Sequence, residues 1–281
     1  MLALPPLAAE PIFMIGQMPI TNSYINSTLT VVGFIIFAFI ISRAMKRFTN
    51  KSPRGLLNFF ESLLETLFQY FDTVTRDRKK TIQFLPLVGT LFLFILVSNW
   101  VGLVPGVGSI GRYLVHEGEV VLVPLFRPAT TDLNLTIGMA IVAVAVSHFL
   151  GIAVIGFVKY FNKFIKIRDL WIALKSLNPM NILTAIIEFF VGLLEIISEV
   201  AKLLSLSLRL FGNIFAGEVL LTVLAGILAV ILPLPFIGLE LIVGIVQATV
   251  FAMLTLVYLT VATTPVESHG GHSEKHAESA A

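Results

Sequence analysis

The chain has 281 residues, of which 57% are hydrophobic and 13% are charged, with a formal net charge of +2. Apolar runs of bilayer-spanning length recur along it, which predicts an all-α polytopic membrane protein and argues against a soluble globular one. The chain has no cysteine, so disulfides and thiolate metal sites are excluded. Its basic residues cluster beside the apolar runs, and no nucleic-acid-binding surface is expected.

The N-terminal residues 1–28 contain no Lys or Arg and one acidic residue, Glu10. A secretory signal peptide would need a basic segment before its apolar core, so we expect an uncleaved segment on the outer side. The first membrane span is predicted over 29–43. Residues 54–75 place apolar side chains on one face and polar ones on the other at helical spacing, which predicts a helix lying in the membrane interface. A soluble-facing bundle helix is the alternative.

Two further spans are predicted over 84–105 and 133–158. Asp132 lies just before the second of these and has the chemistry of a helix N-cap. His148 falls in the middle of the same span. A histidine there could serve a proton path, but we favour a hydrogen bond to a neighbouring helix.

The apolar stretch 180–230 is too long for an upright span. Its 51 residues would extend about 77 Å as one helix, whereas a bilayer core is about 30 Å thick. The helix must therefore be steeply tilted, or it must break near Gly212 or Gly217. The last span is predicted over 236–262, and residues 263–281 form a polar tail that we expect to be disordered and cytoplasmic.

Ionisable residues recur inside the long stretch, and the default interpretation of such residues in a membrane span is functional. Four of them are seven residues apart and form one helical stripe: Glu188, Glu195, Lys202 and Arg209. Glu195 or Glu199 could neutralise Lys202. The helical neighbours of Arg209, at 205, 206, 212 and 213, include no acid, so its partner is expected on another segment or another chain.

The charge distribution predicts an orientation. Fifteen Lys and Arg residues lie in segments assigned to one side of the membrane and two lie on the other. The positive-inside rule then places the N-terminus outside and the C-terminus in the cytoplasm, with five membrane-crossing segments.

The run from Ser205 to Ile214, SLSLRLFGNI, is followed by FAGE ending at Glu218. This run resembles the signature of subunit a of F-type ATP synthases, the stator half of a rotary proton channel, and the resemblance extends over most of the chain. It implies a long inclined helix laid against a curved partner. It also implies a non-catalytic subunit with a ring of c subunits, subunit b of the peripheral stalk, the remaining synthase subunits and the lipid bilayer as partners. A bacterial inner membrane is expected, and the membrane of an organelle is the alternative. No cofactor, metal or bound nucleotide is expected, and the chain has no GxxxxGK[ST] loop.

The resemblance implies a set of proton-translocation residues. Arg209 would face the c-ring, favour the ionised form of each ring carboxyl and block a leak between two half-channels. The outer half-channel is expected to use Glu218, Glu240, Asp132 and Asn134. The inner one is expected to use Ser205, Asn213 and Glu195, and Gln247 matches a glutamine that contacts the arginine. Family members commonly have histidine where this chain has Glu240, so either Glu218 or Glu240 could be the relay.

Two other classes of function remain open at this point. A stand-alone proton- or sodium-coupled secondary transporter also carries charged residues near mid-membrane, but such proteins usually show internal repeats, and none is found here. A non-transporting membrane scaffold would leave the arginine in the span unexplained.

Overall fold

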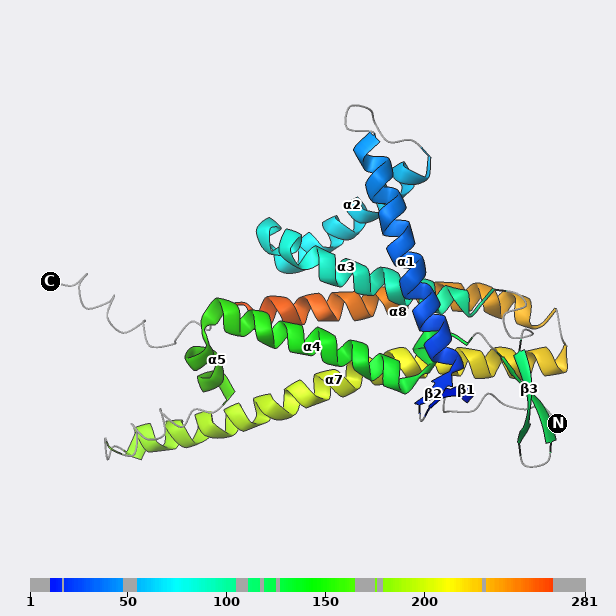
Figure 1. Ribbon diagram of the computed structural model, residues 1–281. Helices are drawn as coiled ribbons and strands as arrows, with labels where there is room; N and C mark the ends of the chain where they lie inside the picture. The colour runs from blue at the N-terminus through cyan, green and yellow to red at the C-terminus, as the bar shows by residue number, and fades with distance from the viewer. Residues whose placement is uncertain are drawn as a thin grey trace. The chain divides into compact units, whose positions relative to one another are not determined.

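The computed structural model describes residues 11–16, 18–47, 55–104, 111–116, 119–124, 127–164, 175, 179–228 and 231–264. Within these residues the chain is almost entirely helical, with two small β-hairpins (Figure 1). The predicted all-α polytopic fold is confirmed. Most of the predicted polar tail lies outside the described residues.

Contacts divide the chain into two units. The first unit comprises Met1–Val144 and Ile197–Val257, and the second comprises Ala145–Ile196 and Tyr258–Ala281. Three long helices begin in one unit and end in the other. All the predicted translocation residues except Glu195 belong to the first unit.

In the described part of the chain, four helices are long and apolar enough to cross a membrane. They are α1 (Asn22–Arg47, apolar over Asn22–Ala44), α3 (Arg78–Val101), α4 (Leu133–Ile155) and α8 (Pro233–Ala262). Each corresponds to a predicted span. The fifth predicted crossing is α7, Pro179–Ile227, a single helix of 49 residues that would extend about 73 Å. The chain continues as helix through Gly212 and Gly217, so the long-helix alternative is confirmed, and its tilt stays a prediction.

Polar caps set the starts of two helices earlier than the apolar runs suggest. The Thr21 hydroxyl accepts a hydrogen bond from the backbone N–H of Tyr24 at 3.3 Å, and α1 begins seven residues before the predicted span. The Asp77 carboxylate accepts one from the N–H of Lys79 at 2.9 Å, so α3 begins at Arg78. The first N–H groups of a helix have no partner within the helix, and a side-chain acceptor just before them supplies one. The helix can therefore begin in the polar residues that precede its apolar run.

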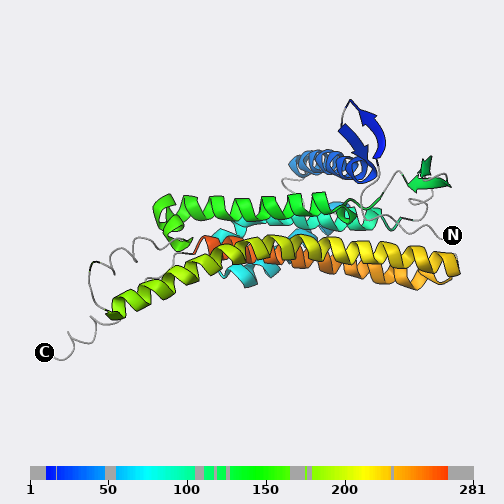
Figure 2. The ribbon, with the colours of Figure 1, turned by 90° about the horizontal axis from the view of Figure 1, so that it is seen from below.

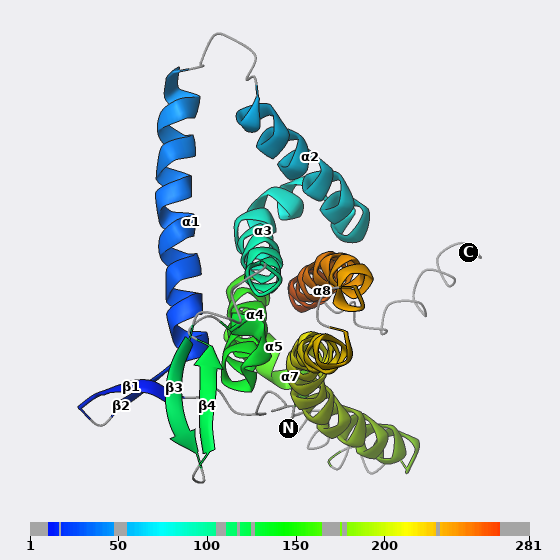
Figure 3. The ribbon, with the colours of Figure 1, turned by 90° about the vertical axis from the view of Figure 1, so that its right-hand side faces the viewer.

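The amphipathic segment forms α2, Leu56–Thr75, as predicted. Arg76 ends it in the left-handed conformation, with a φ of 51°. The Thr81 hydroxyl at the start of α3 then donates to Asp72 at 3.0 Å, which ties the end of α2 to its successor. Figure 3 shows α2 returning toward the beginning of α3. Its placement in the membrane interface stays a prediction.

The two β-hairpins belong to the first unit and were not predicted. β1 (Pro11–Ile15) pairs with β2 (Met18–Thr21), and β3 (Gly111–His116) pairs with β4 (Glu119–Pro124), both antiparallel. The β-branched run in β4 is a strand signal that the sequence offered. The β1–β2 hairpin adjoins the start of α1, as Figures 2 and 3 show.

Within the first unit, the later part of α7 and the earlier part of α8 run side by side (Figures 1 and 2). α8 also approaches α3 closely at Gly244, where an added Cβ would stand 3.3 Å from side-chain atoms of Asn99 and Trp100. The Trp100 indole N–H donates to the carbonyl of Leu241 at 3.2 Å. These contacts hold one face of α8 against the end of α3.

The second unit contains the end of α4 and the short helix α5, Phe157–Phe164. Gly156 has a φ of 93°, a conformation that favours glycine, and it ends α4 three residues before the predicted end of the span. His148 Nδ1 lies 2.7 Å from the Tyr160 hydroxyl of α5. The favoured interpretation of His148, a hydrogen bond to a neighbouring helix, is confirmed.

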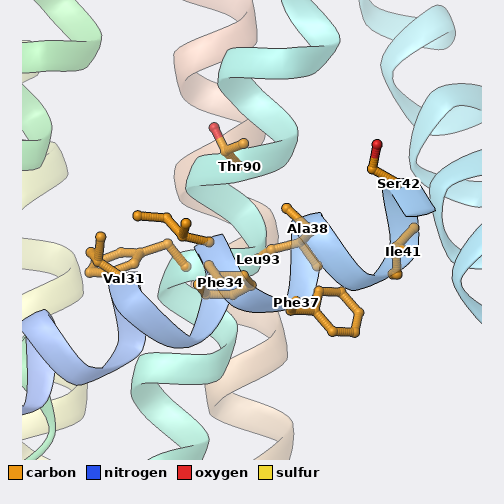
Figure 4. Close-up of a pocket in the computed structure, with 10 residues that line it drawn as sticks. Val31, Phe34, Phe37, Ala38, Ile41, Ser42, Thr90 and Leu93 are labelled. Carbon is orange, nitrogen blue, oxygen red and sulfur yellow. The ribbon is translucent and has the colours of Figure 1, made fainter. Parts of the chain in front are cut away.

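A large groove lies between α1 and α3 in the first unit, with a volume of about 880 Å³ (Figure 4). Aromatic and aliphatic side chains such as Phe34, Phe37 and Leu93 line it, and its polar members are the hydroxyls of Ser42 and Thr90. The groove is apolar, as expected of a surface that meets lipid or another membrane helix. None of the described residues that line it is ionisable, so none of them could carry a proton.

Candidate functional site

A buried ion pair joins the segment before α4 to α7. The Nε of Arg127 donates to both carboxylate oxygens of Glu218, each at 3.1 Å. The arginine side chain is 2% exposed and the glutamate side chain 20% exposed. Hydrogen-bonded charges in such a setting stabilise each other strongly, and removing either one leaves an uncompensated buried charge.

The N-terminal turn of α1 holds Arg127 in position. The side-chain amide of Asn26 donates to the Arg127 carbonyl at 2.7 Å, and that of Asn22 donates to the carbonyl of Pro124 at 3.3 Å. Both asparagines are buried. The backbone is therefore fixed to α1 at the end of β4 and at Arg127 itself.

Glu240 of α8 is the second buried carboxyl of the site, at 8% exposure. It packs against Gly217 of α7 so closely that a Cβ at Gly217 would occupy the position of the carboxylate. Glycine is required here because its missing side chain leaves room for the carboxyl between the two helices. Glu240 makes no hydrogen bond or ion pair with any residue that the structure describes.

Glu218 and Glu240 line one small cavity of about 40 Å³. A cavity needs roughly 10–15 Å³ to accept one water molecule, so this one has room for water between the carboxyl groups. The other lining residues come from α3, α7 and the segments that follow α3 and precede α4: Asn99, Gly102, Leu103, Pro128, Ile214, Gly217 and Leu221. The structure thus brings together the two predicted outer-channel glutamates.

Asn99 adds a fixed polar wall to this cavity. Its carbonyl oxygen accepts a hydrogen bond from the Thr130 hydroxyl at 2.6 Å, and its amide donates to the Gly244 carbonyl at 3.4 Å. Asn99 is 3% exposed, so these bonds satisfy a side chain that water does not reach freely. These two hydrogen bonds tie Asn99 to the segment before α4 and to α8.

Asp132 and Asn134 lie at the start of α4. The Asp132 carboxylate accepts a hydrogen bond from the Asn134 backbone N–H at 2.9 Å, which confirms the predicted N-cap. Asp132 is half-buried and the Asn134 side chain is exposed. This geometry gives Asp132 a structural role, and a role for either residue in a water pathway stays a prediction.

Arg209 is exposed on α7, whereas the nearby side chains of Leu206, Leu210 and Ile214 are buried. Its guanidinium makes no hydrogen bond or ion pair with any residue in the described part of the chain, as its helical neighbours led us to expect. A permanently charged group on an outward face of a membrane helix requires a partner beyond the segments described.

The residues assigned to the inner half-channel share this helix. Ser205 and Asn213, each four residues from Arg209, are exposed like it. Glu195 is half-exposed and belongs to the second unit. Lys202 donates to Glu199 at 2.7 Å, so one of the two acids suggested as its partner is confirmed.

Gln247 of α8 is half-buried. Among the described residues its side chain makes no hydrogen bond, either to Arg209 or to another helix. The structure therefore brings the two glutamates of the outer set together but does not join the glutamine to the arginine. The residues that the structure describes include no cluster of metal-ligating side chains.

The role of Arg127 was missed by sequence reasoning, which counted it only as a charge in an outer loop. Its partner is 91 residues away in the chain. One signal was available, because the helical neighbours of Glu218 include no basic residue. A buried glutamate without a cation on its own helix should draw one from elsewhere.

Membrane-length helices that carry a buried ion pair, a second buried carboxyl and an outward arginine define a class of membrane proteins that move ions or protons. A family model described as "ATP synthase A chain" matches residues 26–260. The chain belongs to this family, and the predicted resemblance is confirmed.

The chain is similar to several curated relatives named "ATP synthase subunit a". That of Campylobacter jejuni subsp. jejuni serotype O:23/36 is 32% identical over 83% of this chain and 88% of the relative. The Gloeobacter violaceus protein is 30% identical over 92% of this chain and 90% of the relative. The Moorella thermoacetica protein is 29% identical over 88% and 93%, respectively. The chain is thus a multi-pass, non-catalytic membrane subunit of a proton-translocating F-type ATP synthase.

Proposed function

We propose that this subunit guides protons to and from a ring of c subunits through two aqueous half-channels, and that Arg209 couples their passage to rotation of the ring. The observation that carries this proposal is the outward position of Arg209. Its guanidinium lies exposed on α7, and no described residue pairs with it. A ring carboxyl passing this face would supply the missing counter-charge.

The chemistry of arginine suits this role. A guanidinium stays protonated at accessible pH and has no acceptor atom, so it cannot relay a proton itself. It attracts a carboxylate and so favours release of the proton that a ring carboxyl carries. Carboxyls that face lipid stay neutral because an isolated charge is costly to bury. Arg209 would thus both discharge the ring and block direct passage between the half-channels.

We place the outer half-channel at the cavity shared by Glu218 and Glu240, with Asp132 and Asn134 toward its mouth. The support is that two buried carboxyls meet there around space for water. The inner half-channel would use Ser205, Asn213 and Glu195 along α7, and Gln247 would approach Arg209 once the ring is bound.

The proposed setting is a bacterial inner membrane with the N-terminus outside and the C-terminus in the cytoplasm. The support is the distribution of Lys and Arg, fifteen against two. In this setting the subunit works with the c-ring, subunit b of the peripheral stalk and the rest of the synthase. It needs no cofactor of its own.

A reconstitution experiment separates this function from that of a secondary transporter. In liposomes with an imposed membrane potential, the purified chain alone is expected to give no proton or sodium uptake above protein-free liposomes. The whole synthase complex in matched liposomes should pump protons when ATP is added. Potential-driven uptake by the chain alone would contradict the stator function, because a subunit that completes its pathway only against the ring cannot conduct without it.

A further inference from the structure

The outer cavity holds two carboxyl groups in different electrostatic surroundings. Both oxygens of Glu218 accept from Arg127 at 3.1 Å. Glu240 is buried at 8% exposure and, in the part of the chain that the structure describes, has no cation, hydrogen bond or ion pair. One carboxyl is held by a fixed charge, and the other faces the cavity.

We propose that Arg127 is a positioning residue of the outer half-channel that holds Glu218 as a permanently paired carboxylate, so that Glu240 is the carboxyl that takes up and releases the proton. This inference rests on the proposed function, and it assigns the relay between two residues that the family resemblance left equivalent.

The ion pair with Arg127 holds Glu218 in its ionised form. Adding a proton to its carboxylate would remove the negative charge that the Arg127 guanidinium, which is 2% exposed, pairs with at 3.1 Å. An uncompensated buried cation is far more costly than a hydrogen-bonded pair. A group whose protonation breaks such a pair is poorly suited to exchange a proton at every step of the ring.

The backbone that carries Arg127 is anchored to α1. The carbonyl of Arg127 accepts a hydrogen bond from Asn26 at 2.7 Å, and Asn22 ties Pro124 to the same helix at 3.3 Å. Both anchors are buried side chains of α1. These bonds fix the backbone from which the Arg127 side chain extends, and the side chain itself is 2% exposed and paired with Glu218. The guanidinium is therefore held beside Glu218, and the two carboxyls keep separate roles.

The surroundings of Glu240 leave its carboxyl free to exchange a proton with water in the cavity. Gly217 of α7 packs against it, and Glu218 of α7, Asn99 of α3 and Pro128 before α4 line the same cavity. Among the described residues that line the cavity, Glu218 is the other ionisable group, and Arg127 pairs with it. Glu240 can thus gain or lose a proton through cavity water without disturbing an ion pair.

The experiment measures ATP-driven proton pumping, as a function of pH, in inverted membrane vesicles that contain the whole synthase. It compares Arg127→Gln, Glu218→Gln, the double variant with both changes, and Arg127→Lys, which keeps the charge. Immunoblots of the membranes correct each rate for the amount of assembled subunit. The double variant removes both buried charges together and places two amides that can hydrogen-bond to each other.

Each single neutralisation is expected to lower pumping about tenfold, because it breaks the ion pair between Arg127 and Glu218 and keeps only one of its two charges. Arg127→Gln should also change the pH profile, since Glu218 then titrates beside Glu240. The double variant should recover to within about threefold of the wild type and regain its pH profile, because the two residues act as a coupled pair. Arg127→Lys should keep the wild-type profile.

Two results would overturn the inference. In one, the double variant is assembled but pumps no better than Glu218→Gln, which makes Glu218 itself the relay. In the other, Arg127→Gln pumps at the wild-type rate with an unchanged pH profile, which denies Arg127 a positioning role. Both outcomes leave the proposed stator function intact, since that function fails only if the chain transports protons without the ring.

Discussion

Replacing Arg209 with alanine is expected to abolish ATP-driven proton pumping by the assembled synthase, to below about 1% of the wild-type rate. The physical reason is that the exposed guanidinium on α7 is the charge that a ring carboxyl would meet, and alanine cannot draw a proton from that carboxyl. Pumping is measured in inverted vesicles by quenching of a pH-sensitive dye after ATP is added.

The same variant is expected to raise passive proton permeability, since no fixed positive charge then separates the half-channels. Arg209→Lys should also lose pumping, because an ammonium is a more strongly hydrated point charge without the planar fork of a guanidinium. Arg43→Ala, which removes an exposed arginine of α1 away from this face, is the control and should pump normally. Normal pumping by Arg209→Ala would mean that the charged stripe of α7 is structural.

Replacing Glu240 with glutamine is expected to lower pumping about a hundredfold, the range in which a lost proton donor or acceptor falls. The amide fits the space beside Gly217 but cannot exchange a proton with water in the cavity. Because the expected loss is chemical, the amount of assembled synthase should stay at the wild-type level. The measurement is the initial pumping rate divided by the amount of subunit in the membrane.

Glu65→Gln is the matched control for this change, since it makes the same substitution at an exposed glutamate of α2. It should leave the rate unchanged. Glu240→Asp, which keeps the carboxyl on a shorter side chain, should retain more activity than the glutamine variant. A Glu240→Gln synthase that pumps like the wild type would remove Glu240 from the proton pathway.

Much of the helical framework could be predicted because long apolar runs determine it locally. All the predicted spans are helices in the structure, and the amphipathic segment is α2. The errors lie at boundaries that single polar side chains control. Thr21 and Asp77 begin helices ahead of their apolar runs, and the backbone of Gly156 ends α4 early.

The site could be predicted only in part. Position along a helix is enough to separate Arg209 from any acid within one turn, whereas its outward direction was expected only from the family resemblance. The pairing of Arg127 with Glu218 depends on how a segment before α4 packs against α7, and no local pattern encodes a contact over 91 residues. The meeting of Glu240 with Gly217 likewise depends on how closely α7 and α8 approach.

The central claim, that the face of α7 carrying Arg209 meets the ring, is tested most directly by disulfide cross-linking. The chain has no cysteine, so Ser205→Cys and Ser207→Cys each introduce a single thiol by the same small change. Ser205 is exposed on the arginine face, whereas Ser207 is 0% exposed. With a cysteine placed beside the ring carboxyl, oxidation should link the ring to Ser205→Cys but not to Ser207→Cys. Linkage at neither position, or at both equally, would contradict the assignment of this face to the ring.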